Sequence, residues 1–311
     1  MPVIAVDFGG TTIKIGLVEQ GEILSTQVIP AISNNGILPR LEEVEAKIKS
    51  MLKEQNISPD ACTGMGIAIP GIVDFHRKRV LSTNRKYDDA PKIDFPKWCR
   101  DSFNLNLMMD NDANCAILGE TKYGCATGAT DAVAMIFGTG IGTAAIIGGK
   151  LLRGKHYQAG CLGGHMIIDR NGPVCSCGNR GCVEALTGTW ALPELSKSRD
   201  GFSGSTLSRQ PVIDYKTLME CVKSGDVFCR DLFADLLDCW GAGIVNLICA
   251  YDPEFVILSG GIMKDSEFVL PHLKQYVEKN AWVPWGKIEF RVSAQPNASV
   301  LLGLYDLCTD I

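Results

Sequence analysis

Apolar and polar positions follow one another in blocks along the chain, and the blocks predict strands that end in glycine turns. Residues 3–19, VIAVDFGGTTIKIGLVE, contain a β-rich run, a Gly/Thr turn and a second β-rich run, which predicts a hairpin. Residues 131–152, DAVAMIFGTGIGTAAIIGGKLL, repeat this design with a GTGIG turn. A helical pattern follows each copy, so we predict an α/β protein with two related lobes.

Two further apolar runs complete the predicted framework. LNLMMD at 105–110 reads as a strand before the helix-favouring segment CAILGETKYG, and the run at 255–258 reads as a buried strand that ends in Ser-Gly-Gly. We place a small lobe at 1–120 and a large lobe at 121–297. A C-terminal helix at about 298–311 is expected to pack back on the small lobe.

Composition narrows the classes of function. The 311 residues are 46% hydrophobic and 21% charged, which is an ordinary composition for a globular protein. The net charge of −5 does not favour binding to the negatively charged backbone of nucleic acid. The N-terminus shows no secretory leader pattern, and no apolar run reaches eighteen residues. We therefore expect a cytoplasmic protein without a nucleic-acid or membrane partner.

The segment 164–186, GHMIIDRNGPVCSCGNRGCVEAL, concentrates one histidine and three of the thirteen cysteines. His165, Cys175, Cys177 and Cys182 match the ligand set of a closed tetrahedral zinc site, which would fix a loop rather than activate water. The alternative is reduced cysteines placed there by chance. Ordering this loop would also order Glu184, whose carboxylate is then placed to line a substrate site.

The first glycine turn has residues suited to phosphate. Gly9 and Gly10 allow close backbone approach to an anion, Thr11 and Thr12 offer N–H and O–H donors, and Asp7 can hold a hydrated Mg²⁺. A Walker A motif and a GxGxxG fingerprint are both absent from it. Taken alone, the turn fits a plain hairpin nearly as well.

The second and third glycine segments extend this pattern. Gly138, Thr139 and Gly140 would form a facing phosphate cradle, so that nucleotide phosphates lie between the two hairpins. Gly260 and Gly261, at the end of a strand, leave room for an adenine or a ribose. A simple strand-to-helix turn is the equal alternative for that pair.

The residues after LNLMMD include a candidate catalytic carboxylate. Asn111 or Asp112 could simply cap the following helix. Because Asp112 follows a strand and falls between the two phosphate hairpins in the chain, it is also placed to accept a proton from a hydroxyl that attacks a γ-phosphate.

Together these residues resemble the ROK sugar kinases, a family within the actin-like, hexokinase-type ATPases. The matching segments are DFGGTTIK, GMGIAIPGIVD, NDANCAILGE, FGTGIGTAAIIGGKLLRG, GHM…CSCGNRGCVEALTG and VILSGGI. The resemblance implies a two-lobed actin-like (ribonuclease H-like) fold with a structural zinc loop, with ATP, Mg²⁺ and Zn²⁺ as cofactors. It also places Lys14 among the nucleotide-binding residues.

By the same resemblance Asp112 is the general base and a set of residues would hold the sugar. This set consists of Gly71, Asn84, Asn111, Asp112, His165 and Glu184. Family members usually carry Glu-x-Gly-His ending at the metal-binding histidine, whereas this chain reads Leu162-Gly163-Gly164-His165. We therefore expect a sugar that carries a substituent near C1 or C2, such as an N-acetyl group or a glycosidic link.

The resulting functional hypothesis is ATP-dependent phosphorylation of a hexose or hexose derivative at its 6-hydroxyl, as in glucokinases, N-acetylhexosamine kinases or β-glucoside kinases. The alternative is a non-catalytic sugar-binding or regulatory member of the family. Only six residues precede Asp7, which disfavours a repressor with an N-terminal DNA-binding module. A homodimer is expected, and Trp282 and Trp285 are interpreted as core aromatics rather than interface anchors.

Overall fold

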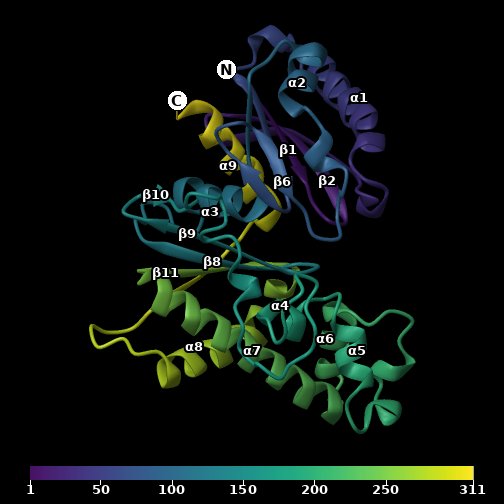
Figure 1. Ribbon diagram of the computed structural model, residues 1–311, viewed down its shortest axis with the longest axis vertical. Helices are drawn as coiled ribbons and strands as arrows, with labels where there is room; N and C mark the ends of the chain where they lie inside the picture. The colour runs from purple at the N-terminus through teal and green to yellow at the C-terminus, as the bar shows by residue number, and fades with distance from the viewer. Residues whose placement is uncertain (311) are drawn as a thin grey trace. The chain divides into compact units, whose positions relative to one another are not determined.

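The computed structural model describes residues 1–310, in which two five-stranded sheets and one two-stranded sheet are covered by helices (Figure 1). The strands are β1 Val3–Phe8, β2 Thr12–Glu19, β3 Glu22–Pro30, β4 Gly64–Ile69, β5 Ile72–Asp74, β6 Arg79–Ser82, β7 Leu107–Asn111, β8 Ala132–Phe137, β9 Ile141–Ile147, β10 Lys150–Leu151, β11 Phe255–Gly260 and β12 Glu289–Val292. The helices are α1 Leu38–Glu54, α2 Phe95–Phe103, α3 Asp112–Tyr123, α4 Val183–Thr187, α5 Leu192–Lys197, α6 Tyr215–Lys223, α7 Val227–Tyr251, α8 Ser266–Asn280 and α9 Pro296–Thr309.

The chain forms two compact units. The first contains Met1–Thr130, Ala144–Cys161 and the segment that begins at Ser293, and the second contains Asp131–Thr143 and Leu162–Val292. Residues 121–130 and 144–161, which the sequence assigns to the large lobe, therefore belong to the first unit. The boundary inside β9 is invisible in the sequence, because a strand keeps one apolar pattern along its length.

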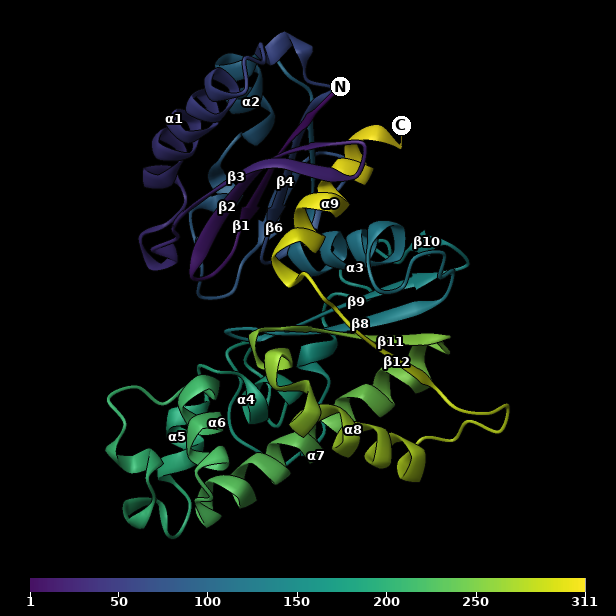
Figure 2. The same cartoon turned by 180° about the vertical axis from the view of Figure 1, so that it is seen from behind.

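The sheet of the first unit has the order β3-β2-β1-β4-β7. The predicted N-terminal hairpin is confirmed, with β1 antiparallel to β2 and Asp7 opposite Lys14. Strands β1, β4 and β7 are parallel, so their carboxyl ends lie at the same end of the sheet. Helices α1 and α2 cover one face and α9 covers the other (Figure 2).

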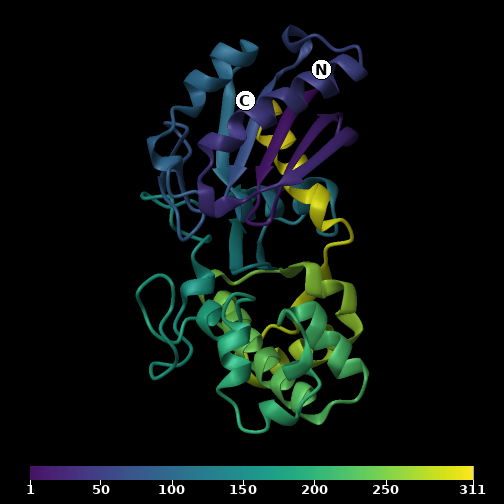
Figure 3. The same cartoon turned by 90° about the vertical axis from the view of Figure 1, so that its right-hand side faces the viewer.

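The predicted C-terminal helix is observed as α9, which packs in the first unit against α3, β1 and β4 (Figure 3). Glycines allow the close approach of α3 and α9. A Cβ on Gly119 would overlap the carbonyl oxygen of Ser299, and one on Gly303 would overlap that of Cys115. The carboxylate of Glu120 in α3 also accepts hydrogen bonds from the hydroxyls of Ser293 and Ser299.

In the second unit β8 and β11 are parallel neighbours, and Phe137 pairs with Gly260. The predicted strand, glycine turn and strand at 131–152 are observed as β8 and β9. Helix α7 contacts α4, α6, α8 and β8, and α7 and α8 lie below the strands in Figure 1. The carboxyl ends of β8 and β11 thus bring two predicted glycine segments together.

One helix of the described chain, α7, is long and apolar enough to cross a membrane by length and composition alone. Of its most apolar stretch, 56% is buried inside the fold, with Trp240 and Ile244 fully enclosed. Core helices of globular domains have this character.

Replacing Gly303 by Ala tests whether helix propensity or helix–helix packing has the larger effect on stability at this position. Propensity alone would stabilise α9 by about 1 kcal/mol, whereas the overlap with α3 should lower the free energy of unfolding by about 1–3 kcal/mol. Urea denaturation measures the sign, with Gly204→Ala, where a Cβ meets no atom within 4 Å, as the matched control. A stabilised Gly303→Ala variant would show that the two helices do not pack this closely.

Candidate functional site

The turn between β1 and β2 is held by hydrogen bonds to its carbonyl groups. The Tyr87 hydroxyl donates to the Gly9 carbonyl at 2.8 Å, and the Ser33 hydroxyl donates to the Gly10 carbonyl at 2.9 Å. Tyr87 is fully buried and adopts a φ of 55°, which is uncommon for a bulky residue. Thr11, at the tip, is exposed. The predicted phosphate turn is therefore held in place through its carbonyl groups, whereas its tip is exposed to solvent.

Two acidic side chains lie behind this turn. Asp7 is 4% exposed, and its Oδ2 lies 3.2 Å from the Lys14 ammonium. Burial raises the pKa of Asp7 to about 6, although Lys14 opposes the shift, and the neighbouring charge of Asp112 adds to it. Burial also raises the pKa of Asp112, against the lowering effect of Lys86.

The end of β7 and the start of α3 explain the local roles of Asn111 and Asp112. The Asn111 side chain caps α3, accepting from the N–H groups of Ala113 at 2.9 Å and Asn114 at 3.3 Å. Its Nδ2 donates to the Gly71 carbonyl at 3.0 Å. The capping role thus belongs mainly to Asn111. Asp112 is the first helical residue, and its Oδ1 accepts from the Ala113 N–H at 2.9 Å.

Gly71 contacts this strand end through Asn111, whereas Asn84 follows β6 in the chain. Gly71 has a φ of 135°, and a Cβ there would overlap the Ser82 carbonyl oxygen, so only glycine fits this turn. Asn84 lies on the exposed loop after β6. Two residues further on, Lys86 approaches Gly10, with 2.8 Å between its Nζ and the place of a Gly10 Cβ. The sequence reasoning did not identify Lys86.

In the second unit, the 138–140 turn is closed by its own backbone and by the segment after α4. Gly138 N–H donates to the Gly140 carbonyl at 3.0 Å, and the Thr189 hydroxyl donates to the Gly138 carbonyl at 2.7 Å. Thr139 is exposed. Gly260 has a φ of 114°, and a Cβ on Gly261 would meet nothing within 4 Å. Gly261 therefore has open space beside it, whereas a Cβ on Gly260 would overlap the Phe137 carbonyl oxygen.

Glu184 connects the turn to the cysteine-rich loop. Its Oε2 accepts from the Ile141 N–H at 3.0 Å, and its Oε1 accepts from the Ser176 hydroxyl and the Trp190 indole, each at 3.3 Å. A Cβ on Gly140 would overlap the same carboxylate. Glu184 therefore supports the GTG turn of its own unit, a role that the spacing of motifs did not indicate.

The structure brings the four predicted metal ligands together. The ligand atoms of His165, Cys175, Cys177 and Cys182 all lie within 4.8 Å of one another. Cys175 Sγ is 3.6 Å from His165 Nδ1, and Cys177 Sγ is 3.7 Å from Cys182 Sγ. Turns at glycines allow this convergence, since Gly178 has a φ of 94°. The cluster offers one imidazole and three sulfur ligands within the span of one ion.

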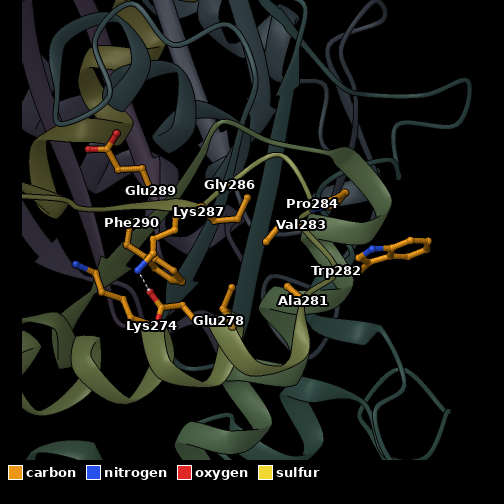
Figure 4. A pocket seen from close by; sticks show the side chains of 12 residues that line it. Lys274, Glu278, Ala281, Trp282, Val283, Pro284, Gly286, Lys287, Glu289 and Phe290 are labelled. Atoms are coloured by element: carbon orange, nitrogen blue, oxygen red, sulfur yellow. Dashed lines mark hydrogen bonds and ion pairs between the residues drawn. The ribbon is translucent and has the colours of Figure 1, made fainter.

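The second unit also contains a cavity of about 740 Å³ between the end of α8, the loop 281–288 and β12. None of the predicted site residues lines it. In Figure 4 Lys287 pairs with Glu278 among the side chains that line the cavity, and Trp282 is another of its lining residues. Trp282 is 87% exposed and Trp285 is 60% exposed, so the interpretation of both as core aromatics is wrong. Both residues lie on the loop between α8 and β12, where their side chains are at the protein surface and not among the buried residues.

The features of the two units are those of the ROK family. The model of that family matches residues 3–310, and the chain belongs to it. A glucokinase of Thermotoga maritima is 30% identical over 285 residues, which cover 89% of this chain and 87% of that protein. A xylose repressor of Bacillus spizizenii is 29% identical over 229 residues, 74% of this chain and 56% of the repressor.

Solved structures agree with this assignment. A ROK family glucokinase from Streptomyces griseus, in complex with glucose and AMPPNP, matches with a TM-score of 0.81 and 27% identity over 99% of both chains. A ROK hexokinase from Thermus thermophilus matches with a TM-score of 0.77 and 27% identity, over 98% of this chain and 96% of that one. The mixed α/β fold is therefore shared with sugar kinases.

The buried Asp7 predicts a pH-dependent stability. Because folding raises its pKa from 3.8 to about 6, the stability that its protonated form contributes is complete below pH 3.8 and is lost as the pH rises through 6. Relative to Asp7→Asn, the wild type should lose about 3 kcal/mol between pH 3.5 and pH 7.5.

Urea unfolding at several pH values measures this difference, and Asp60→Asn at an exposed position is the control. Parallel stability curves for Asp7→Asn and the wild type would contradict the burial of an ionisable Asp7.

Proposed function

We propose that this protein transfers the γ-phosphoryl group of ATP to the 6-hydroxyl of a hexose or hexose derivative, on an actin-like (ribonuclease H-like) scaffold. The observation that carries the proposal is the Asp112 carboxylate at the start of α3, in a chain of the ROK family. Asp112 is half-buried, desolvation raises the pKa of its carboxyl, and its charge acts on Asp7 in β1. Glucokinases among its relatives support a sugar as acceptor.

In this proposal the first unit performs the chemistry. Asp112 accepts the proton of the sugar hydroxyl as the oxygen attacks the γ-phosphorus in line. Its raised pKa suits this task, because a base with a pKa nearer neutrality takes and later releases the proton readily. Asn111, Gly71 and Asn84 are the proposed sugar contacts of this unit.

The remaining nucleotide contacts are proposed on open glycine backbone. The exposed N–H and hydroxyl groups of Thr11 and Thr139 are available as phosphate donors, and Gly261 leaves space for the adenosine. Mg²⁺ bound with the nucleotide would neutralise phosphate charge. Asp7 is the carboxylate placed to hold its hydration shell, with Lys14 alongside.

We further propose zinc at His165, Cys175, Cys177 and Cys182. The donor set fits, since three sulfurs and one imidazole within 4.8 Å suit a tetrahedral site without an open position. Zinc would supply cross-linking of the loop, and Ser176 within that loop donates to Glu184. His165 and Glu184 are the proposed sugar contacts of the second unit.

The sugar class is proposed from Leu162. Its carbonyl accepts from the His165 N–H at 2.9 Å, which places this apolar side chain directly before the 163–165 turn. A leucine cannot accept the hydrogen bonds of hydroxyls that a glutamate would hold. A hexose with an N-acetyl group or a β-glycosidic link is therefore the proposed acceptor. The homodimer and the cytoplasmic location stay predictions.

An ADP-release assay with MgATP tests the function across hexoses, N-acetylhexosamines and β-glucosides. Turnover is expected with a substituted sugar, and a clear preference for glucose would reject the role of Leu162. Asp112→Asn should lower kcat by at least about 100-fold while sugar affinity, measured by calorimetry, stays within a few-fold. Absence of turnover on the whole panel by folded, zinc-loaded protein would favour the non-catalytic alternative.

The proposed zinc site predicts one zinc ion per chain in protein purified without chelator. Cys175→Ser should lose most of this metal and raise KM for the sugar, because the loop that supports Glu184 is released. Elemental analysis and kinetics measure the two effects, with Cys249→Ser, at an exposed cysteine outside the cluster, as control. Unchanged zinc content in Cys175→Ser would disprove the ligand set.

A further inference from the structure

The Lys86 side chain reaches from the loop after β6 to the glycine turn of the first unit. A Cβ on Gly10 would lie 2.8 Å from both Nζ and Cε of Lys86, so the ammonium end of the side chain rests against the Gly10 backbone. The same charge acts on Asp112 more strongly than that of Lys14 does. One cation therefore lies beside both the phosphate turn and the proposed base.

Lys86 is also free of carboxylate partners. Among residues 1–310, no carboxylate oxygen lies within 4.0 Å of its Nζ, whereas Lys14 on the neighbouring strand pairs with Asp7 at 3.2 Å. A half-buried ammonium has three donors and gives up part of its hydration. Its charge is thus available to an anion that enters beside Gly10.

The backbone around Lys86 is attached to the same turn. The adjacent Tyr87 donates its hydroxyl to Gly9, and its N–H donates to the Ser33 carbonyl at 2.9 Å. Ser33 in turn donates to Gly10. The Phe8 and Tyr87 rings stack edge to face at 6.0 Å. The loop and the turn are therefore joined by hydrogen bonds and an aromatic contact directly beside Lys86.

We propose that Lys86 is a catalytic cation that contacts the phosphoryl group during its transfer. This rests on the proposed kinase function. The sugar oxygen forms a bond to the γ-phosphorus, the bond from that phosphorus to the β–γ bridging oxygen breaks, and its electron pair leaves with ADP. The hydroxyl proton passes to Asp112. Lys86 keeps its protons and balances the charge on the transferred oxygens.

The charge of Lys86 also affects the pKa of Asp112. As the ammonium lowers the pKa of the Asp112 carboxyl, its removal should move the acidic limb of the kcat/KM profile to higher pH. The other titratable groups that act on Asp112 or feel its charge are Asp7, Lys14, Cys115 and Cys161.

The test compares Lys86→Met, Lys86→Arg and the control Lys92→Met, at an exposed lysine six residues away. With the sugar that the wild type turns over, Lys86→Met should lower kcat by about 100-fold or more, and Lys86→Arg should restore part of it. KM for the sugar should change less than threefold. Calorimetry with MgAMPPNP should show at most a tenfold loss of affinity, because the interaction strengthens only during transfer.

A kcat for Lys86→Met within threefold of the wild type would overturn the proposal, as would a change confined to the KM for the sugar. Such results leave the kinase function intact, since the wild type and Lys92→Met still turn over. A wild type that fails on the whole sugar panel instead removes the kinase function, and the role of Lys86 falls with it.

Discussion

Desolvation of the Asp7 and Asp112 carboxylates at one end of the first sheet is the constraint around which the candidate site is arranged. Loss of hydration raises the pKa of both carboxyls, and the charge of Asp112 adds to the shift at Asp7. Lys14 and Lys86 oppose this from two different elements. The parallel register of β1, β4 and β7 gathers the strand ends there, which brings Asp7 and the start of α3 to the same edge of the sheet.

In the second unit, the arrangement around the glycine turn depends on the carboxylate of Glu184. Glu184 receives hydrogen bonds from the backbone after the GTG turn, from the cysteine-rich loop and from Trp190. The carboxylate thus joins the strand that follows the 138–140 turn to two segments that lie within eight residues of Glu184 itself. The cysteine-rich loop and the glycine turn are therefore connected through this one carboxylate.

The local sequence pattern was sufficient to predict elements whose structure depends on residues close together in the chain. The alternation in residues 3–19 predicted a hairpin, the helical period near the C-terminus predicted α9, and four ligand-type residues within eighteen predicted their own convergence. The exposed Trp282 and Trp285 were assigned incorrectly, because an apolar residue type indicates a preference for burial and not whether a core is within reach.

What the sequence determined by itself was the two strand–turn–strand segments, the C-terminal helix and the Cys/His cluster, since each depends on residues close together in the chain. Only the tertiary structure decided which distant residues contact one another. Lys86 and Tyr87 stand next to each other in the chain, yet their roles arise from Gly9 and Gly10, which are more than seventy residues away. Sequence spacing carries no information on such contacts, because only the packing of the 84–89 loop against the β1–β2 turn creates them.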